Sequence, residues 1–101
     1  MSDDEFVRYV YILKRLPGSE LGEGVVKAHV AHIRRLESDG ILDMCGPFSD
    51  GEGGMVILKG CSFEQAWDAA ESDPFVLEGL ETFDLRKWDL SAEENGHMGM
   101  G

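Results

Sequence analysis

Residues 29–50 read HVAHIRRLESDGILDMCGPFSD, and this stretch decides the fold. Apolar residues at helical spacing run up to Leu36, and Gly40 is a typical residue for closing a helix. The apolar run Ile41–Cys45 then predicts a strand, which Gly46-Pro47 ends. The stretch therefore predicts a helix that leads through a glycine turn into a strand, with His29 on the helix and Asp50 beyond the strand.

The segments on either side extend this pattern. Residues 6–16 are rich in Val, Tyr and Ile and predict a first strand, which Leu16-Pro17-Gly18-Ser19 ends. Residues 20–39 have helical spacing, and residues 54–59 predict a third strand. The predicted inner face of this first helix consists of residues at i, i+4, i+7 and i+10: Val26, Val30, Ile33 and Leu36.

The second half of the chain repeats the alternation of helix and strand. Ser62 and Gln65 fit a capping box, so a second helix begins at Phe63, with Phe63, Ala66, Trp67 and Ala70 on its buried face. Asp73-Pro74-Phe75 predicts a short helical turn with Asp73 as its N-cap. Residues 80–90 predict a fourth strand, and residues 91–101 a flexible tail.

The order of elements is β-α-β-β-α-β, which predicts a ferredoxin-like α+β fold over residues 6–90 of a single domain spanning 1–101. Such a fold has a four-stranded antiparallel sheet with two helices on one face. The bare face needs a cover, and a second copy of the sheet is the simplest one. We therefore expect a homodimer, or a higher oligomer, of the dimeric α/β-barrel type.

Composition excludes several classes of protein. Nine basic and twenty acidic residues give a net charge of −11, which repels phosphate backbones and anionic lipids, so we expect no nucleic-acid or membrane partner. No apolar run approaches the ~20 residues that cross a bilayer, and the N-terminus is not a signal peptide, so a cytoplasmic location is expected. Cys45 and Cys61 fit no CxxC pattern and are predicted to be buried or half-buried thiols.

The chain resembles the YciI-like (YCII-related) family of the dimeric α/β-barrel group, and the resemblance covers residues 6–90. The matching residues, in order, are His29 with Leu36, Gly40, Leu42, Gly46-Pro47, Asp50, Gly54, Asp73-Pro74-Phe75, Gly79 and Lys87-Trp88. The resemblance implies a dimer and a proposed acid–base site with a histidine on the first helix and an aspartate after the second strand, here His29 and Asp50. Members include an enzyme type that removes chloride from a chlorinated hydroxyquinol, and related barrels include muconolactone isomerases and cofactor-free monooxygenases.

His29 and Asp50 are accordingly the predicted catalytic pair. His29 falls within the apolar face of the helix, where a buried structural histidine is the alternative reading. Asp50 lies in Phe-Ser-Asp-Gly, a good turn sequence, so a turn-forming role is its alternative. A carboxylate beside an imidazole fixes the tautomer of the ring and supports its charged form, which favours a proton-transfer function for the pair.

Other residues are weaker candidates for binding a substrate. His32 lies near the edge of the helical face and is expected to flank the site or to face solvent. The remaining candidates are residues of the first strand, the glycine-rich loop and the second helical cap: Tyr9, Tyr11, Pro47, Ser49 and Asp73. Asp73 is foremost a helix cap, and the two tyrosines serve equally well as core or dimer contacts.

We expect neither a metal nor a cofactor. His29, His32 and Asp50 supply suitable ligand atoms, but rings at i and i+3 diverge by about 60° around the helix, and no zinc motif is present. No GxGxxG, P-loop or nucleophile-elbow motif is present either.

Together these expectations favour a cofactor-independent enzyme of the lyase or isomerase type, acting on a small cyclic or aromatic hydroxylated compound through a His–Asp pair. The alternative is a non-catalytic protein that binds a small molecule or serves as an accessory subunit.

Overall fold

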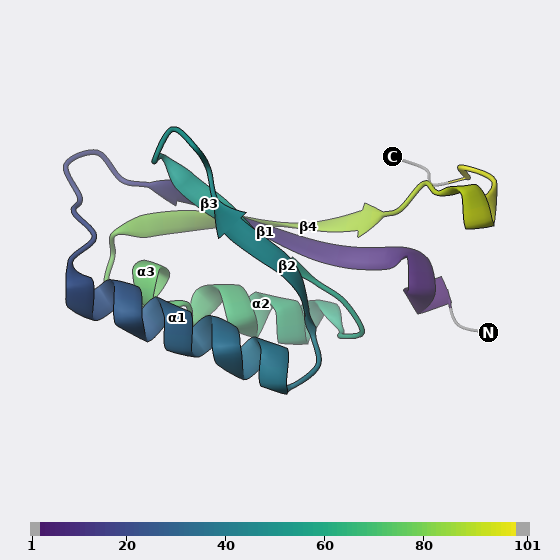
Figure 1. Cartoon of the computed structure of the whole chain (residues 1–101), viewed down its shortest axis with the longest axis horizontal. Coiled ribbons are helices and arrows are strands. Elements are labelled where there is room, and N and C mark those ends of the chain that lie inside the picture. Colours follow the sequence, from purple (N-terminus) through teal and green to yellow (C-terminus); the bar gives the residue numbers. More distant parts are fainter. Residues whose placement is uncertain (1–2, 99–101) are drawn as a thin grey trace.

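The computed structural model of the protein describes residues 3–98 (Figure 1). Every predicted helix and strand is present, and the predicted β-α-β-β-α-β order is confirmed. The elements are β1 (Val7–Arg15), α1 (Glu23–Ser38), β2 (Leu42–Pro47), β3 (Gly53–Leu58), α2 (Phe63–Glu71), α3 (Pro74–Leu77) and β4 (Glu81–Asp89), with short 3-10 turns at Asp3–Phe6 and Glu93–Asn95.

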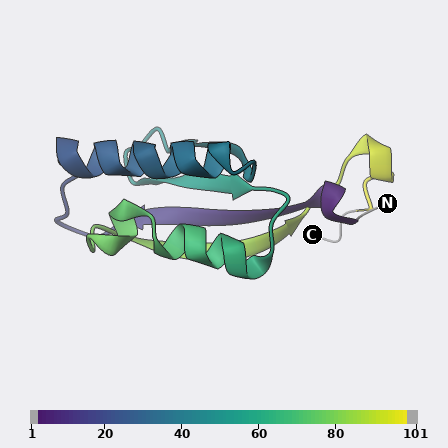
Figure 2. The same ribbon diagram turned by 90° about the horizontal axis from the view of Figure 1, so that it is seen from below.

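The four strands form one antiparallel sheet in the order β2-β3-β1-β4. Tyr11 in the middle of the central strand β1 lies opposite Val56 of β3 and Leu85 of β4. In Figure 2 all three helices lie on the same face of the sheet. On that face α1 runs along one flank of β1, and α2 and α3 lie along the other flank. This is the predicted ferredoxin-like arrangement.

The hydrophobic core lies between the sheet and the helices. Tyr11 and Leu13 of β1 point into it together with Val56 and Leu58 of β3, as the alternation of side chains along a strand requires. The helices contribute Leu36, Ala66, Ala69, Ala70 and Phe75. Because the α2 residues in the core are alanines, this helix can approach the sheet closely.

The predicted inner face of α1 is confirmed at Ile33 and Leu36, which pack in the core, and wrong at Val26 and Val30. Val26 and Val30 are 37% and 40% exposed, whereas His32 and Leu36 are buried. Val25 and His29 are half-buried, so the inward stripe runs at i, i+4, i+7 and i+11 from Val25. The inward positions predicted for Val26 and Val30 are therefore taken by Val25, His29 and His32, of which only His29 was expected within this face.

The aromatic residues of α2 are also less buried than predicted. Phe63 and Trp67 are 46% and 42% exposed. Trp67 packs edge-on against Phe83 of β4 at a centroid distance of 5.0 Å and stacks on Phe63 at 6.2 Å. These rings cover the side of the core, and the alanines of α2 lie beneath them.

The connection between β2 and β3 is a compact turn, and it begins after Gly46 and Pro47, the residues that we expected to end the strand. β2 extends through Pro47, and the turn closes with hydrogen bonds from the Phe48 amide to the Gly53 carbonyl (2.8 Å) and from the Gly51 amide to the Phe48 carbonyl (3.0 Å). Gly53 has a φ of +122°, and a Cβ atom there would lie 1.9 Å from the carbonyl oxygen of Leu13. Only glycine fits this position.

The C-terminal segment carries a short turn where we predicted none. Asn95 accepts a hydrogen bond from the Ala92 amide (3.0 Å) and donates one to the Leu90 carbonyl (2.9 Å). This turn lies beside the N-terminal 3-10 turn at one end of the sheet (Figure 1). The flexibility of residues 91–101 stays a prediction, and its last three residues lie outside the described part of the chain.

Candidate active site

Asp73 is the centre of the site. Its backbone is the N-cap of α3, and its carboxylate oxygen Oδ1 accepts a hydrogen bond from the Phe75 amide at 3.0 Å, which confirms the predicted cap. The same oxygen lies 2.9 Å from Nδ1 of His29, and the Tyr11 hydroxyl donates to Oδ2 at 2.9 Å. Asp73 is 0% exposed, and these three donors compensate for its removal from water.

His29 reaches Asp73 from the inward face of α1. Its ring stacks on Phe75 with a centroid distance of 4.2 Å and an angle of 14° between the planes. Because a carboxylate can only accept, Nδ1 of His29 carries the proton in this pair, and Nε2 of a neutral ring is then an unprotonated base. The His29 side chain is 19% exposed, so water or a small molecule has access to the ring.

The structure does not pair His29 with Asp50, and this prediction is corrected. Asp50 is exposed in the β2–β3 turn, where its Oδ1 accepts a hydrogen bond from the Glu52 amide at 2.9 Å. This is the turn-forming role that we gave as its alternative. The acid beside His29 is Asp73, which we had placed among the substrate-binding candidates.

His32 is buried, contrary to our expectation that it flanks the site or faces solvent. Its Nε2 donates to the Ala69 carbonyl at 2.8 Å. Ala69 belongs to the last turn of α2, where carbonyl groups lack partners within the helix. His32 therefore satisfies the end of α2 and ties α1 to it.

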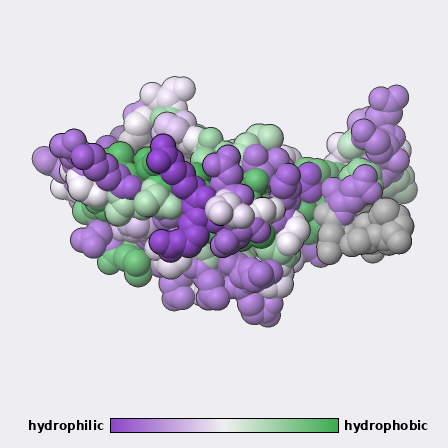
Figure 3. Space-filling view, turned by 60° about the horizontal axis from the view of Figure 1, so that its bottom comes forward, coloured by the Kyte–Doolittle hydropathy of each residue, from purple (hydrophilic) through white to green (hydrophobic). Residues whose placement is uncertain are grey.

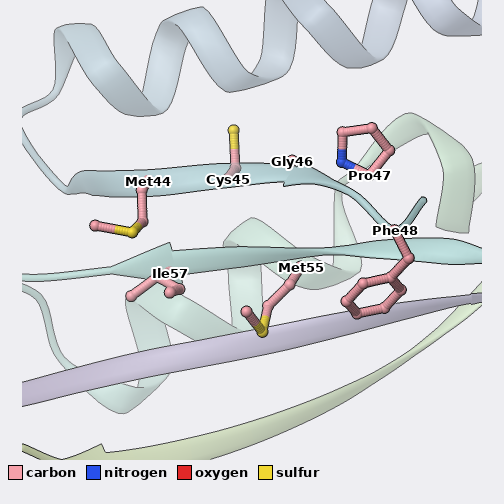
Figure 4. A pocket seen from close by; sticks show the side chains of 7 residues that line it. All are labelled: Met44, Cys45, Gly46, Pro47, Phe48, Met55 and Ile57. Atoms are coloured by element: carbon pink, nitrogen blue, oxygen red, sulfur yellow. The ribbon is translucent and has the colours of Figure 1, made fainter.

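The other predicted binding residues lie in three different places. Tyr9 is half-buried on β1, on the same face as Tyr11, and packs edge-on against Phe63 at 6.1 Å. Ser49 is exposed in the β2–β3 turn. Pro47 borders a hollow of about 250 Å³ along β2 and β3, shown in Figure 4. Binding roles for Tyr9, Pro47 and Ser49 stay predictions.

Burial and the neighbouring Asp73 carboxylate determine the protonation of Tyr11. Burial, and then the nearby Asp73 carboxylate, raise the pKa of Tyr11 well above its ordinary value of 10.0. The Tyr11 hydroxyl is therefore a permanent hydrogen-bond donor to Asp73 at neutral pH.

Glu81 is a second acid near this pair that the sequence analysis missed. It is the first residue of β4 and is 3% exposed. Burial raises its pKa above the ordinary value of 4.5, and the Asp73 carboxylate adds to the effect. Its position on the inner face of β4, two residues before Phe83, was the available signal.

Phe75 was the other omission. We used it only to recognise the short helix, but its ring supports His29 and its amide donates to Asp73. The signal was the Asp-Pro-Phe sequence itself, since the amide two residues after an aspartate cap is one that the cap carboxylate accepts from.

Cys45 also differs from its prediction, because it is exposed on β2, whereas Cys61 is half-buried as expected. Burial and the nearby Glu37 raise the pKa of the Cys45 thiol. In Figure 4 the Cys45 side chain points toward α1, away from Met44 and Ile57.

Two general features of residues 3–98 bear on function. None of their helices is both long enough and apolar enough to cross a membrane, and they contain no group of three metal-binding side chains. The face in Figure 3 is mostly hydrophilic with smaller hydrophobic areas between, consistent with the acidic composition.

The comparisons with known proteins agree with this architecture. The uncharacterized protein YjpA of Bacillus subtilis (strain 168) is 29% identical over 82 residues, which cover 81% of this chain and 96% of YjpA. A solved structure with the same fold is 5-chloro-2-hydroxyhydroquinone dehydrochlorinase (TftG) from Burkholderia phenoliruptrix AC1100, in complex with 2,5-dihydroxybenzoquinone. Its TM-score is 0.67 at 19% identity, and the match covers 86% of this chain and 97% of TftG. The model of the YCII-related domain matches residues 7–89, and the chain therefore belongs to the family of YCII-related domains.

Proposed function

We propose that this protein is a cofactor-independent enzyme of the lyase or isomerase type that acts on a small cyclic or aromatic hydroxylated compound. His29 takes up or delivers the proton through Nε2, and Asp73 holds the ring in the required tautomer. Proton transfer by a positioned side chain typically contributes ~10²–10⁴-fold to a rate.

The single observation that carries the proposal is the 2.9 Å contact between His29 Nδ1 and the buried Asp73 carboxylate. A histidine whose tautomer is fixed on one side and whose other nitrogen is free is arranged for acid–base chemistry near neutral pH. Stacking on Phe75 restricts the ring further, which reduces the entropy lost in positioning it.

The substrate class is supported by the structural neighbour. TftG is named for dehydrochlorination of a hydroxylated ring and is bound to a dihydroxyquinone. Removal of HCl from such a ring needs a proton acceptor and no redox cofactor, which is chemistry that an imidazole and a carboxylate can perform.

We also propose that the protein is a homodimer in the cytoplasm. The face of the sheet that lies away from the helices carries Val10, Ile57 and Met55, with Met44 and Trp88 59% and 45% exposed. Val10 and Ile57 are already buried in a single copy, but Met44 and Trp88 are left next to water, and a second copy of the sheet would bury them. Light scattering at several protein concentrations tests this state, and a monomer at ~100 µM would contradict it.

The test of the enzyme proposal compares the purified wild type with three variants. Chloride release from 5-chloro-2-hydroxyhydroquinone, together with a panel of hydroxylated rings, is measured for the wild type, His29→Gln, Asp73→Asn and Asp50→Asn. We expect the first two variants to lose ~10²-fold or more in kcat/KM, and Asp50→Asn, an exposed acid, to stay within about threefold of the wild type. Folded His29→Gln protein with wild-type turnover would refute the proposal.

A non-catalytic binding or accessory protein is the second candidate, and it is supported by the stacked, hydrogen-bonded state of His29. In that case the wild type binds hydroxylated rings without turning any over. NMR titration of the ring nitrogens distinguishes the candidates, because a catalytic His29 titrates together with kcat, whereas a structural one keeps one form throughout.

A further inference from the structure

A second carboxyl group lies buried beside the His29–Asp73 pair. Glu81 begins β4 and lies opposite Arg15, the last residue of β1. It shares the inner face of the sheet with Phe83 and Leu85, both of which pack against the core. Only 3% of Glu81 is exposed, so its side chain lies under the helices and not in solvent.

Within residues 3–98 this carboxyl group has no hydrogen-bond or ion-pair partner. Glu81 Oε1 is buried without a hydrogen bond, and no ion pair of residues 3–98 includes Glu81. The neighbouring Arg15 directs its guanidinium to the carbonyls of Ser19 (2.6 Å) and Gly51 (3.3 Å) instead. Buried polar atoms are normally satisfied, so an unsatisfied one next to a proposed active site requires an explanation.

We propose that Glu81 is a third residue of this site, and that its carboxyl group in the neutral form donates a hydrogen bond to an oxygen atom of the ligand. The inference rests on the proposed function, because it takes the space beside His29 and Asp73 as the ligand site. It assigns the substrate a second oxygen substituent, held by Glu81 while another part of the ring meets His29.

The charges around Glu81 support its neutral form. The groups that act on it are the Asp73 carboxylate before α3, the His29 ring on α1 and the Arg15 guanidinium on β1. Burial and Asp73 raise the pKa of Glu81, and His29 and Arg15 oppose them more weakly. An ionised Glu81 would face a second carboxylate and could only accept a hydrogen bond, whereas a protonated one can donate to a ligand oxygen that carries no hydrogen, such as a quinone carbonyl.

The first test measures protonation without any ligand. Carbon-13 NMR follows the side-chain carboxyl groups from pH 3 to 9, and Glu81→Gln assigns the signal. Glu78, three residues earlier and exposed, provides the matched reference. We expect Glu81 to ionise at a higher pH than Glu78, and ionisation of the two together would overturn the proposal.

The second test measures binding of 2,5-dihydroxybenzoquinone by calorimetry between pH 4 and 9. We expect wild-type affinity to fall by ~10-fold per pH unit once Glu81 ionises, because one proton is required for binding. Glu81→Gln keeps a neutral donor and should lose this pH dependence, whereas Glu78→Gln should follow the wild type. A Glu81→Gln variant with the wild-type pH profile, or a wild type that does not bind this quinone at any pH, would overturn the inference.

The two proposals fail in different experiments. If the quinone binds with the expected pH dependence but no hydroxylated ring is turned over, the enzyme proposal fails and the role of Glu81 stands. If His29→Gln abolishes turnover while Glu81→Gln changes neither titration nor binding, only the inference about Glu81 fails.

Discussion

Replacement of Tyr11 by phenylalanine tests the network around Asp73 directly. The change removes one hydroxyl that is completely buried and donates to Asp73 Oδ2 at 2.9 Å, and it leaves the ring in the core. A hydrogen bond to a charged group contributes about 1.5–3 kcal/mol, and Asp73 keeps its two other donors. We therefore expect the free energy of unfolding to fall by about 2 kcal/mol, which lowers Tm by roughly 10 °C for a chain of this size.

Urea unfolding followed by tryptophan fluorescence measures this change. Protein concentration is held constant, because the stability of a dimer depends on it. Tyr9→Phe is the matched control, since Tyr9 lies on the same face of β1 and its hydroxyl has no hydrogen bond within residues 3–98. We expect that variant to stay within about 0.5 kcal/mol of the wild type.

A double-mutant cycle with Asp73→Asn isolates the contact. If the hydroxyl and the carboxylate interact as described, the two single changes should be non-additive by about 1 kcal/mol or more. Equal effects of Tyr11→Phe and Tyr9→Phe, or full additivity with Asp73→Asn, would refute the assignment of Tyr11 to this network.

Three further changes test other parts of the structure. His32→Leu should lower the free energy of unfolding by about 1–3 kcal/mol in urea titrations, because the Ala69 carbonyl loses the hydrogen bond from His32. Gly53→Ala should cost about 3 kcal/mol or prevent folding because its Cβ overlaps a backbone carbonyl, whereas Gly51→Ala, with a φ of +77° but open space, should cost only about 1 kcal/mol. The raised pKa of Glu81 means that the native state holds this proton more tightly than the unfolded chain, so this contribution to stability is complete below pH 4.5 and is lost as pH rises through the native pKa. Glu81→Gln should therefore gain stability relative to the wild type between pH 4.5 and 8, and a constant difference would contradict the argument.

Most of the fold could be predicted because the signals were local. The capping box at Ser62 and Gln65 and the cap at Asp73 each involve residues within three positions, and the structure confirms both. Strand alternation placed Tyr9 and Tyr11 on one face for the same reason.

The face of α1 was harder to predict because two registers fit its apolar residues. Val25 and Val26 are adjacent, so a stripe with helical spacing can begin at either one. Both stripes end at Leu36. The correct register includes His29 and His32, which look polar in a sequence. Their burial depends on acceptors provided by α2 and the α2–α3 junction, and the sequence of α1 does not contain that information.

The partner of His29 could not be predicted from spacing. Asp50 lies 21 residues after His29 and Asp73 lies 44 residues after it, and either distance along the chain allows contact in a folded domain. The choice is made by packing, because α3 lies against α1, whereas the β2–β3 turn directs Asp50 into its own backbone.

The three contacts of the Asp73 carboxylate have a consequence for how the sequence of this protein can change during evolution. One carboxylate starts a helix, anchors the central strand and aligns the imidazole. A descendant without the proposed proton transfer could exchange the imidazole at little cost, whereas loss of the acid would also remove the helix cap and the hydrogen bond to Tyr11. In relatives without the proposed activity we therefore expect the histidine to be replaced more often than the aspartate.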